Sequence, residues 1–250
     1  MEEAPEWSAE TVFKAGFFFE LGLVPVAALL AWIARGTPFP FPLSFAGKDL
    51  LLGLGATLPL LAIGQLLLSP LGRRVAWAQG MYECLKKLLG RPIREMTGQQ
   101  LVLLAGAAGL GEEVFFRGVL QTLTSLWAST FFFRAFDPIF GALTTSLILG
   151  PIVTAFAIVV TSLVFGLFHP LTKAYVVLAF LISLYLGWLF VVTHNLLVPI
   201  LVHWIYDAYA LYCFRNQLLE EAAEKSDEPC ASRSSREPEG PPNRDNMGAL

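Results

Sequence analysis

The sequence of 250 residues predicts an all-α protein, a polytopic bundle of transmembrane helices followed by a disordered polar tail. Two observations support this fold class. Hydrophobic residues make up 55% of the chain and charged residues only 15%, whereas soluble proteins carry about 25% charged residues. The apolar residues also gather in runs of about 20, the length of helix that crosses a bilayer. We therefore expect a multi-pass integral membrane protein, located in the inner membrane if the cell is bacterial.

Six segments are apolar enough and long enough to be predicted as membrane spans. They are residues 12–34, 49–68, 100–123, 148–168, 174–192 and 196–214. Residues 127–147 are ambiguous, because this stretch fits either a further short span or a folded loop. Additional crossings there would bring the number of spans to seven or eight.

The segment between the second and third spans is basic, with six Lys and Arg residues against two Glu residues in 72–98. Such an excess of positive charge marks a cytoplasmic loop. Residues 81–89 within it are predicted to form an amphipathic helix at the membrane surface. With two spans before this loop, the N-terminus is expected on the same side. Because the first ten residues lack the basic start of a secretory signal, the first span is expected to be retained.

These features divide the chain into three regions. Residues 1–97 hold two spans and the basic loop, residues 98–214 form the main membrane domain, and residues 215–250 form the tail. The tail is predicted to be disordered because it is rich in Pro, Ser, Arg and Glu and has almost nothing to bury. The net charge of −3 argues against a nucleic-acid partner, which requires clustered basic residues.

Ionisable side chains are rare in the apolar region from Gln99 to Phe214. Because such groups are costly in hydrocarbon, they tend to face a bundle interior or a wet cavity and to mark chemistry. The seven charged residues and three histidines of this region are Glu112, Glu113, Arg117, Arg134, Asp137, Lys173, Asp207, His169, His194 and His203.

The strongest signal is the pair of adjacent glutamates in the segment Gly109–Gln121. On a helix, Glu113 and Arg117 are four residues apart and are predicted to pair along one face. Glu112 then points about 100° away and is available as a general base. A buried ion pair kept only for structure would explain Glu113 and Arg117 but would leave Glu112 as an unpaired acid.

Two histidines are candidates for the same site. His203 and Asp207 are also four apart, so the aspartate is expected to fix the tautomer of the imidazole or raise its basicity. A polar pair between helices is the structural alternative. His169 ends a span directly before Pro170. Its assignment to the site depends on the presence of the glutamates, because a single histidine at a helix end is more often a cap or interface residue. His194 lies in a short link between two spans and is expected to stay outside the chemistry.

The motifs Glu-Glu-x-x-x-Arg, Phe-x-x-x-His and His-x-x-x-Asp occur in this order across separate spans. With them the chain resembles the CAAX prenyl endopeptidase and bacteriocin-processing family of membrane proteases, also called CPBP or Abi proteins. The resemblance covers residues 98–214 and is best at 111–121, 162–170 and 195–207. It implies an all-helical hydrolase, and hence a catalytic membrane domain at 98–214, with its catalytic groups in a cavity open to the cytosolic side.

The resemblance also implies a role for each polar residue. Glu112 would activate a water molecule with help from His169, and Glu113 and Arg117 would support them. His203 and the residue four positions later would stabilise the oxyanion of the tetrahedral intermediate. The candidate catalytic residues are therefore Glu112, Glu113, Arg117, His169, His203 and Asp207.

Asp207 departs from the family pattern, because many members have asparagine at this position. An ionised aspartate cannot donate a hydrogen bond to an oxyanion. Either Asp207 is protonated, or it orients His203 while His203 alone donates. The family implies no cofactor and no metal, and the HExxH zinc signature is missing, although Glu112, His169, His203 and Asp207 are residue types that bind divalent ions.

The sequence thus predicts an intramembrane endopeptidase with CAAX-type activity. Its expected partners are the lipid bilayer and a peptide or lipidated-protein substrate that is cleaved near its terminus. A non-catalytic immunity or scaffold protein that keeps the polar cluster for folding is the main alternative. A proton-coupled transporter is the least favoured alternative, because the chain is short and lacks paired broken helices.

Overall fold

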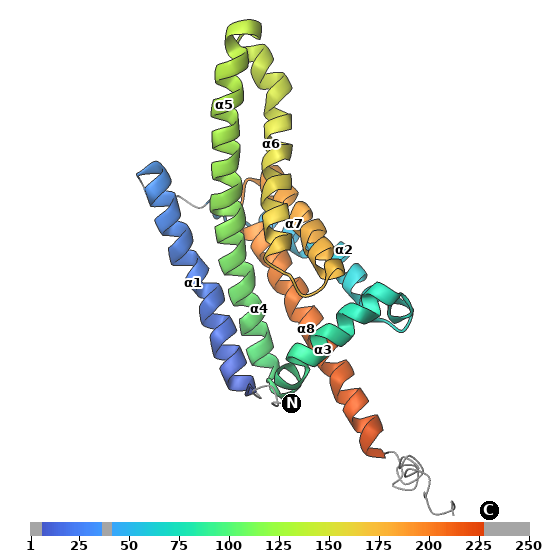
Figure 1. The fold of residues 1–250 in the computed structure, drawn as a ribbon. Coiled ribbons are helices and arrows are strands. Elements are labelled where there is room, and N and C mark those ends of the chain that lie inside the picture. The colour runs from blue at the N-terminus through green and yellow to red at the C-terminus, as the bar shows by residue number, and fades with distance from the viewer. Residues whose placement is uncertain (1–6, 37–41, 228–250) are drawn as a thin grey trace, which may run out of the picture.

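Every secondary-structure element in the computed structural model, which describes residues 7–36 and 42–227, is a helix. The order of these elements along the chain is shown in Figure 1. They are α1 (Ala9–Arg35), α2 (Gly47–Leu68), the 3₁₀ turn η1 (Gly72–Arg74), α3 (Ala76–Glu95), α4 (Gly98–Glu113), the π-helix η2 (Val114–Gln121), α5 (Thr122–Phe140), α6 (Ala142–Leu167), α7 (Lys173–Thr193) and α8 (Leu197–Asp227). The predicted all-α class is therefore confirmed.

Five helices of the described residues, α1, α2, α6, α7 and α8, are long and apolar enough to cross a membrane. They correspond to five of the six predicted spans. The remaining segment, residues 100–123, forms α4, η2 and the start of α5, and here a π-helix interrupts the α-helical run. The chain is thus a multi-pass membrane protein with five candidate spans and a further internal helical run.

The ambiguous segment 127–147 forms neither a separate span nor an irregular loop. It is the far end of a helical hairpin, in which α5 reverses into α6 at Gly141 with a φ of 79°. Glycine adopts this left-handed backbone region without the steric cost that a side chain brings. The hairpin extends beyond the ends of the other helices at the top of Figure 1, and α5 packs along α6 over its length.

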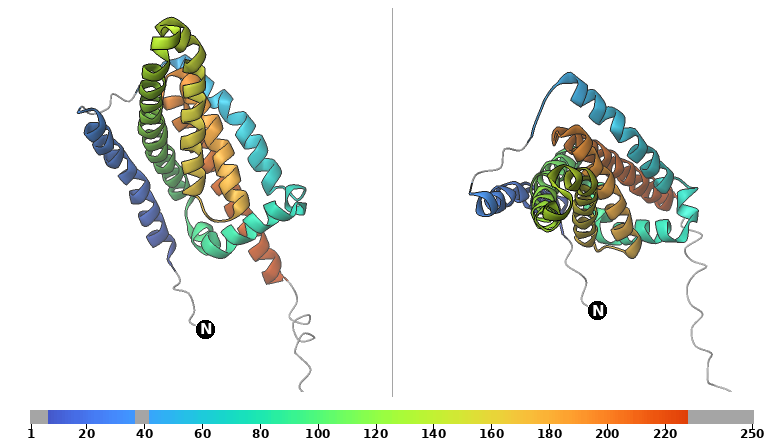
Figure 2. Two further views of the ribbon diagram at one scale, coloured as in Figure 1. Left: turned by 45° about the horizontal axis from the view of Figure 1, so that its top comes forward. Right: turned by 90° about the horizontal axis from the view of Figure 1, so that it is seen from above.

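The predicted amphipathic helix at 81–89 is confirmed as part of a longer helix, α3. This helix lies across one end of the bundle, at a steep angle to the other helices (Figures 1 and 2). Its buried face includes Tyr82 and Ile93, which pack against Phe214 and Leu218 of α8. Helix α3 carries four of the six Lys and Arg residues of segment 72–98, and the positive-inside rule predicts that this end of the bundle faces the cytosol.

The last helix continues beyond the predicted span, which ended at Phe214. Residues 215–227 are helical instead of belonging to an irregular tail, and Leu218 packs against α3. Glu221 accepts a 2.7 Å hydrogen bond from the hydroxyl of Tyr82 and pairs with Arg73 and Lys86. Burial and this hydrogen bond raise the pKa of Tyr82. Residues 228–250 of the predicted tail lie outside the described residues.

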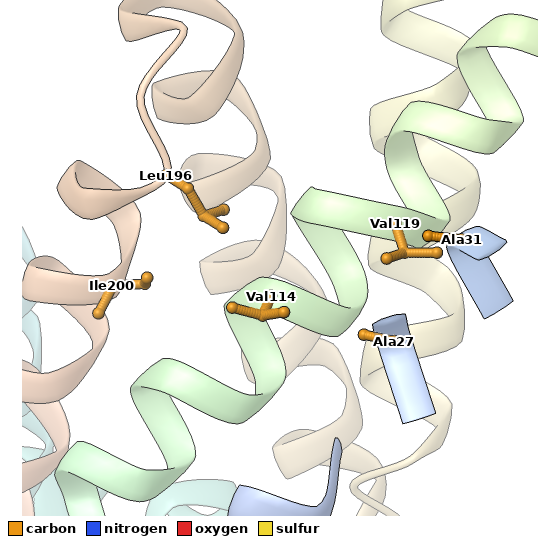
Figure 3. Close-up of a cluster of buried hydrophobic side chains, with 6 residues drawn as sticks. All are labelled: Ala27, Ala31, Val114, Val119, Leu196 and Ile200. Atoms are coloured by element: carbon orange, nitrogen blue, oxygen red, sulfur yellow. The ribbon is translucent and has the colours of Figure 1, made fainter. Parts of the chain in front are cut away.

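Helix α1 is held against the middle of the bundle by small side chains. Figure 3 shows Ala27 and Ala31 of α1 beside Val119 of η2, and Val114 of η2 on the side of Ile200 and Leu196, which complete the cluster. Both alanines are fully buried. Small residues let helix backbones approach closely in a membrane, where packing rather than the hydrophobic effect holds helices together. This contact brings α1 within reach of the polar residues of α4.

Candidate active site

Two glycines of α4 let neighbouring helices approach on different sides. A Cβ at Gly111 would lie 1.9 Å from the carbonyl oxygen of Glu20 in α1. A Cβ at Gly109 would lie 3.0 Å from the backbone nitrogen of Trp204 in α8. Helix α4 lies so close to α1 and α8 that neither position accepts a side chain without displacement of a neighbour. Glu112 therefore lies between α1 and α8.

The π-helix η2 begins directly after the two glutamates and directs two polar side chains toward α7. Arg117 donates to both the carbonyl and the hydroxyl oxygen of Ser183, at 3.0 and 2.9 Å. One turn later, Gln121 donates to the carbonyl oxygen of Gly187. Isolated π-turns within α-helices occur frequently at functional sites. Here the π-helix holds the arginine against the backbone of α7.

The predicted pair of Glu113 and Arg117 is confirmed, with Oε1 and Nη1 3.0 Å apart. Their side chains are only 0% and 1% exposed. The same Oε1 atom lies 2.8 Å from Nδ1 of His203, so this nitrogen donates its proton to the carboxylate. Helical spacing does not predict this contact, which joins α4 to α8 across 90 positions of the chain. Glu113 thus fixes the orientation of the His203 ring.

His203 directs its other ring nitrogen at two more carboxylates. Nε2 lies 3.3 Å from Oδ2 of Asp207 and 3.7 Å from Oε2 of Glu112. The predicted proximity of His203 and Asp207 is therefore confirmed. Because Glu113 already holds Nδ1, Asp207 is not needed to set the orientation of the ring. A proton on Nε2 lies between the carboxylates of Asp207 and Glu112.

His169 faces Glu112 from the other side. Its Nδ1 lies 2.8 Å from the carbonyl oxygen of Phe165 and must donate there, because a carbonyl oxygen only accepts. In the neutral imidazole, Nε2 is then an acceptor, 3.7 Å from Oε1 of Glu112. Burial lowers the pKa of His169, although the hydrogen bond to Phe165 opposes this change. The neutral form is thus favoured at neutral pH.

A cavity of about 360 Å³ opens beside these groups. Its size is typical of ligand sites. Its lining includes Leu89 of α3, so the cavity lies toward the end of the bundle that α3 covers. The polar side chains that line it are those of Glu112, His169, His203, Asp207, Glu20, Tyr175 and Tyr206.

Four of the six predicted site residues therefore meet at one cavity, and Glu113 and Arg117 lie buried directly behind it. Glu20 also lines the cavity, although the motifs that predict the site do not include it. Two signals point to it: an acid within a membrane span is expected to face a polar interior, and the small-residue run at 105–111 predicts a close neighbour for α4.

The other ionisable residues of the apolar region do not join the site. His194 caps α7 in the left-handed backbone region with a φ of 47° and is exposed, in agreement with the prediction that it lies outside the chemistry. Arg134 and Asp137 are on the hairpin of α5 and α6, and Lys173 starts α7. Among the described residues, no group of three or more His, Cys, Asp or Glu side chains is arranged to hold a metal ion.

Comparison with known proteins relates part of the chain to a family. No curated protein and no solved structure matches the chain. The family model described as type II CAAX prenyl endopeptidase Rce1-like matches residues 96–209, the part of the chain that contains Glu112, Glu113, Arg117, His169, His203 and Asp207. With five candidate membrane spans and this match, the chain is a multi-pass membrane protein whose residues 96–209 form a domain of the Rce1-like type II CAAX prenyl endopeptidase family.

Proposed function

We propose that this protein is an intramembrane endopeptidase that hydrolyses a peptide bond of a membrane-associated or lipidated substrate. One observation carries the proposal: the carboxylate of Glu112 faces a ring nitrogen of His169 and of His203 at 3.7 Å each, beside an open cavity. These separations are too long for direct hydrogen bonds, and a water molecule on the cavity side of the three groups can contact all of them. CAAX-type cleavage is the activity that the family match supports.

Glu112 and His169 hold and activate the water. Because Nδ1 of His169 donates to Phe165, Nε2 accepts one proton of the water in a hydrogen bond, and Glu112 accepts the other. As the water oxygen attacks the scissile carbonyl carbon, its proton passes to Glu112. General-base assistance of this kind contributes about 10²- to 10⁴-fold to the rate. The proton on Glu112 is then available for the leaving amine.

His203 stabilises the oxyanion that forms. Its Nδ1 proton is bound to Glu113, so in the imidazolium form Nε2–H points into the cavity. Asp207 accepts from the same Nε2–H and favours the charged imidazolium. Arg117 neutralises Glu113, so that this carboxylate orients the ring without remaining an unpaired buried charge. The arrangement supports donation to the oxyanion by His203 alone, with Glu113 rather than Asp207 orienting its ring.

The test uses the purified protein in nanodiscs and a prenylated peptide that ends in cysteine, two aliphatic residues and a final residue. Glu112→Gln keeps the shape of the side chain but removes the base, so the hydrolysis rate should fall by about 10²- to 10⁴-fold. Glu83→Gln, at an exposed position of α3, is the matched control and should keep the native rate. Thermal unfolding of all three proteins checks that they are folded.

Equal rates for the native protein and Glu112→Gln would contradict the proposed mechanism. Absence of hydrolysis by the native protein, together with biological function that persists in Glu112→Gln, would instead favour a scaffold that keeps the polar cluster for folding.

A further inference from the structure

Glu20 is a carboxylate of the cavity to which the proposed hydrolysis gives no role. It lies in α1, far outside the family match at residues 96–209. The backbone of Glu20 touches α4 at Gly111, one residue before Glu112. Its side chain lines the same cavity as Glu112, His203 and Asp207. The fold therefore adds to the site an acid that comes from outside the family domain.

The carboxylate of Glu20 is incompletely satisfied. Its Oε2 atom is buried and has no hydrogen-bond partner in the described part of the protein. Buried polar groups are normally paired, and an unpaired one calls for an explanation such as a catalytic role or an absent ligand. In a membrane protein the cost of such a group is a further reason to look for a function. An unpaired oxygen at a cavity is a potential acceptor for a ligand.

The balance of charge in the cavity points to the kind of ligand. Three carboxylates line it, those of Glu20, Glu112 and Asp207, and none of the described lining residues is Lys or Arg. His203 provides one positive charge when protonated, while His169 is neutral in the proposed mechanism. Carboxyl groups therefore outnumber cationic groups at this surface. A group that adds positive charge would be stabilised there.

The same cavity offers further contacts for a cation. Asp207 is 32% exposed, so its carboxylate remains accessible beside His203. The rings of Tyr175 and Tyr206 also line the cavity, and aromatic rings attract ammonium and guanidinium groups. A free carboxylate of a substrate, by contrast, finds no lysine or arginine among the described lining residues with which to pair.

We propose that Glu20, together with Asp207, binds the protonated amine or guanidinium of a Lys or Arg residue close to the scissile bond, and so makes this protein select cationic peptide substrates. The inference rests on the proposed peptidase function and specifies its substrate class. Glu20 is then a specificity residue that touches the substrate, whereas Glu112 and His203 carry the chemistry. A charge-assisted hydrogen bond of this kind corresponds to a preference of about tenfold or more.

The experiment measures kcat/KM in nanodiscs for matched prenylated peptides. Norleucine, which has nearly the shape of lysine without its charge, is replaced by lysine at each position around the cleaved bond in turn. The native protein should prefer lysine over norleucine by about tenfold or more at one position at least. In Glu20→Gln that ratio should fall toward one. Glu10→Gln is the control, because Glu10 is an exposed acid of the same helix that pairs with Lys14.

The outcomes separate the two proposals. Hydrolysis by the native protein without a preference for lysine at any position would overturn the role of Glu20 and leave the peptidase standing, and this result needs no variant. An unchanged ratio in folded Glu20→Gln would overturn it as well, because a group other than Glu20 would then recognise the lysine. Failure of the native protein to hydrolyse any peptide of the set would overturn the proposed function and, with it, the inference.

Discussion

Two polar clusters in this protein place carboxylates beside cations, and they differ in how completely the carboxylates are paired. The α8-end cluster joins one carboxylate to two cations and a phenol, and consists of Glu221, Arg73, Lys86 and Tyr82. The cavity cluster joins three carboxylates to two imidazoles, and consists of Glu20, Glu112, Asp207, His169 and His203. Both lie in a chain in which only 15% of the residues are charged.

The difference indicates what each cluster is for. Glu221 has a partner for each oxygen and lies at the partly exposed end of a helix, where it fastens α8 to α3. In the cavity, Glu112 has no direct hydrogen bond and Glu20 has a buried oxygen without a partner in the described part of the chain. Carboxylates without full pairing are unfavourable in an apolar bundle, and such groups cluster at functional sites. We therefore interpret the α8-end cluster as structural and the cavity cluster as chemical.

The largest expected effect on stability is at Arg117, which lies directly behind the cavity. Arg117→Met leaves the buried Glu113 carboxylate without its cation and should lower the free energy of unfolding by about 3–5 kcal/mol. Arg134→Met, the same substitution at an exposed position of α5, should change it by less than about 0.5 kcal/mol. Unfolding in nanodiscs or mixed micelles measures both. A loss at Arg117 no larger than that at Arg134 would contradict the buried ion pair.

The next effect concerns activity and is at His203. His203→Ala removes the donor to the oxyanion and should lower kcat by about 10²- to 10³-fold, equivalent to about 2.7–4 kcal/mol. Asp207→Asn keeps the shape of its side chain and gains a donor, so its loss should stay below about tenfold. Hydrolysis of the prenylated peptide under saturation compares the two variants. A larger loss in Asp207→Asn than in His203→Ala would contradict the assignment of oxyanion stabilisation to His203.

A smaller effect is expected at Gly111, where α1 touches α4. Gly111→Ala places a methyl group 1.9 Å from the carbonyl oxygen of Glu20, so α1 must shift, at a cost of about 1–3 kcal/mol. Gly55→Ala in α2, where nothing lies within 4 Å, is the matched control and should be neutral or slightly stabilising. Equal unfolding free energies for the two variants would contradict the close approach of α1 that brings Glu20 to the cavity.

The smallest effect is expected in the α8-end cluster. Glu221→Gln keeps a hydrogen-bond acceptor for Tyr82 but removes the negative charge, and partly exposed ion pairs contribute about 1 kcal/mol or less. Peptidase activity should not change, because Glu221 does not line the cavity. The unfolding free energy and the hydrolysis rate of one preparation test both points. A loss of activity without a loss of stability would contradict the division into a structural and a chemical cluster.

Local pairs in the sequence were predictable because helical geometry determines them. Glu113 and Arg117, like His203 and Asp207, are four residues apart, and a helix places such residues on one face whatever surrounds it. The runs of apolar residues likewise identified the helices that are long enough to span a membrane. These conclusions depend only on neighbours along the chain.

Contacts between distant helices were not predictable from the same patterns. The bond of His203 to Glu113 and the position of Glu20 beside the cavity depend on which helix faces meet, and apolar spans look alike on all faces. The helical end of α8 was missed because its polar composition resembles that of a tail, whereas in the structure Glu221 finds its partners on α3 and before it. Pairing across the bundle therefore required the structure.

The most direct test of the central claim, that the cavity cluster around Glu112 performs hydrolysis, compares cell membranes that carry the native protein or Glu112→Gln at matched abundance. Quantitative mass spectrometry records all peptide termini in the two samples. We predict new termini on membrane-associated or lipidated proteins that are present with the native protein and absent with Glu112→Gln. Identical sets of termini, in cells where loss of the protein has a phenotype that Glu112→Gln restores, would contradict the claim and leave the cluster a structural role.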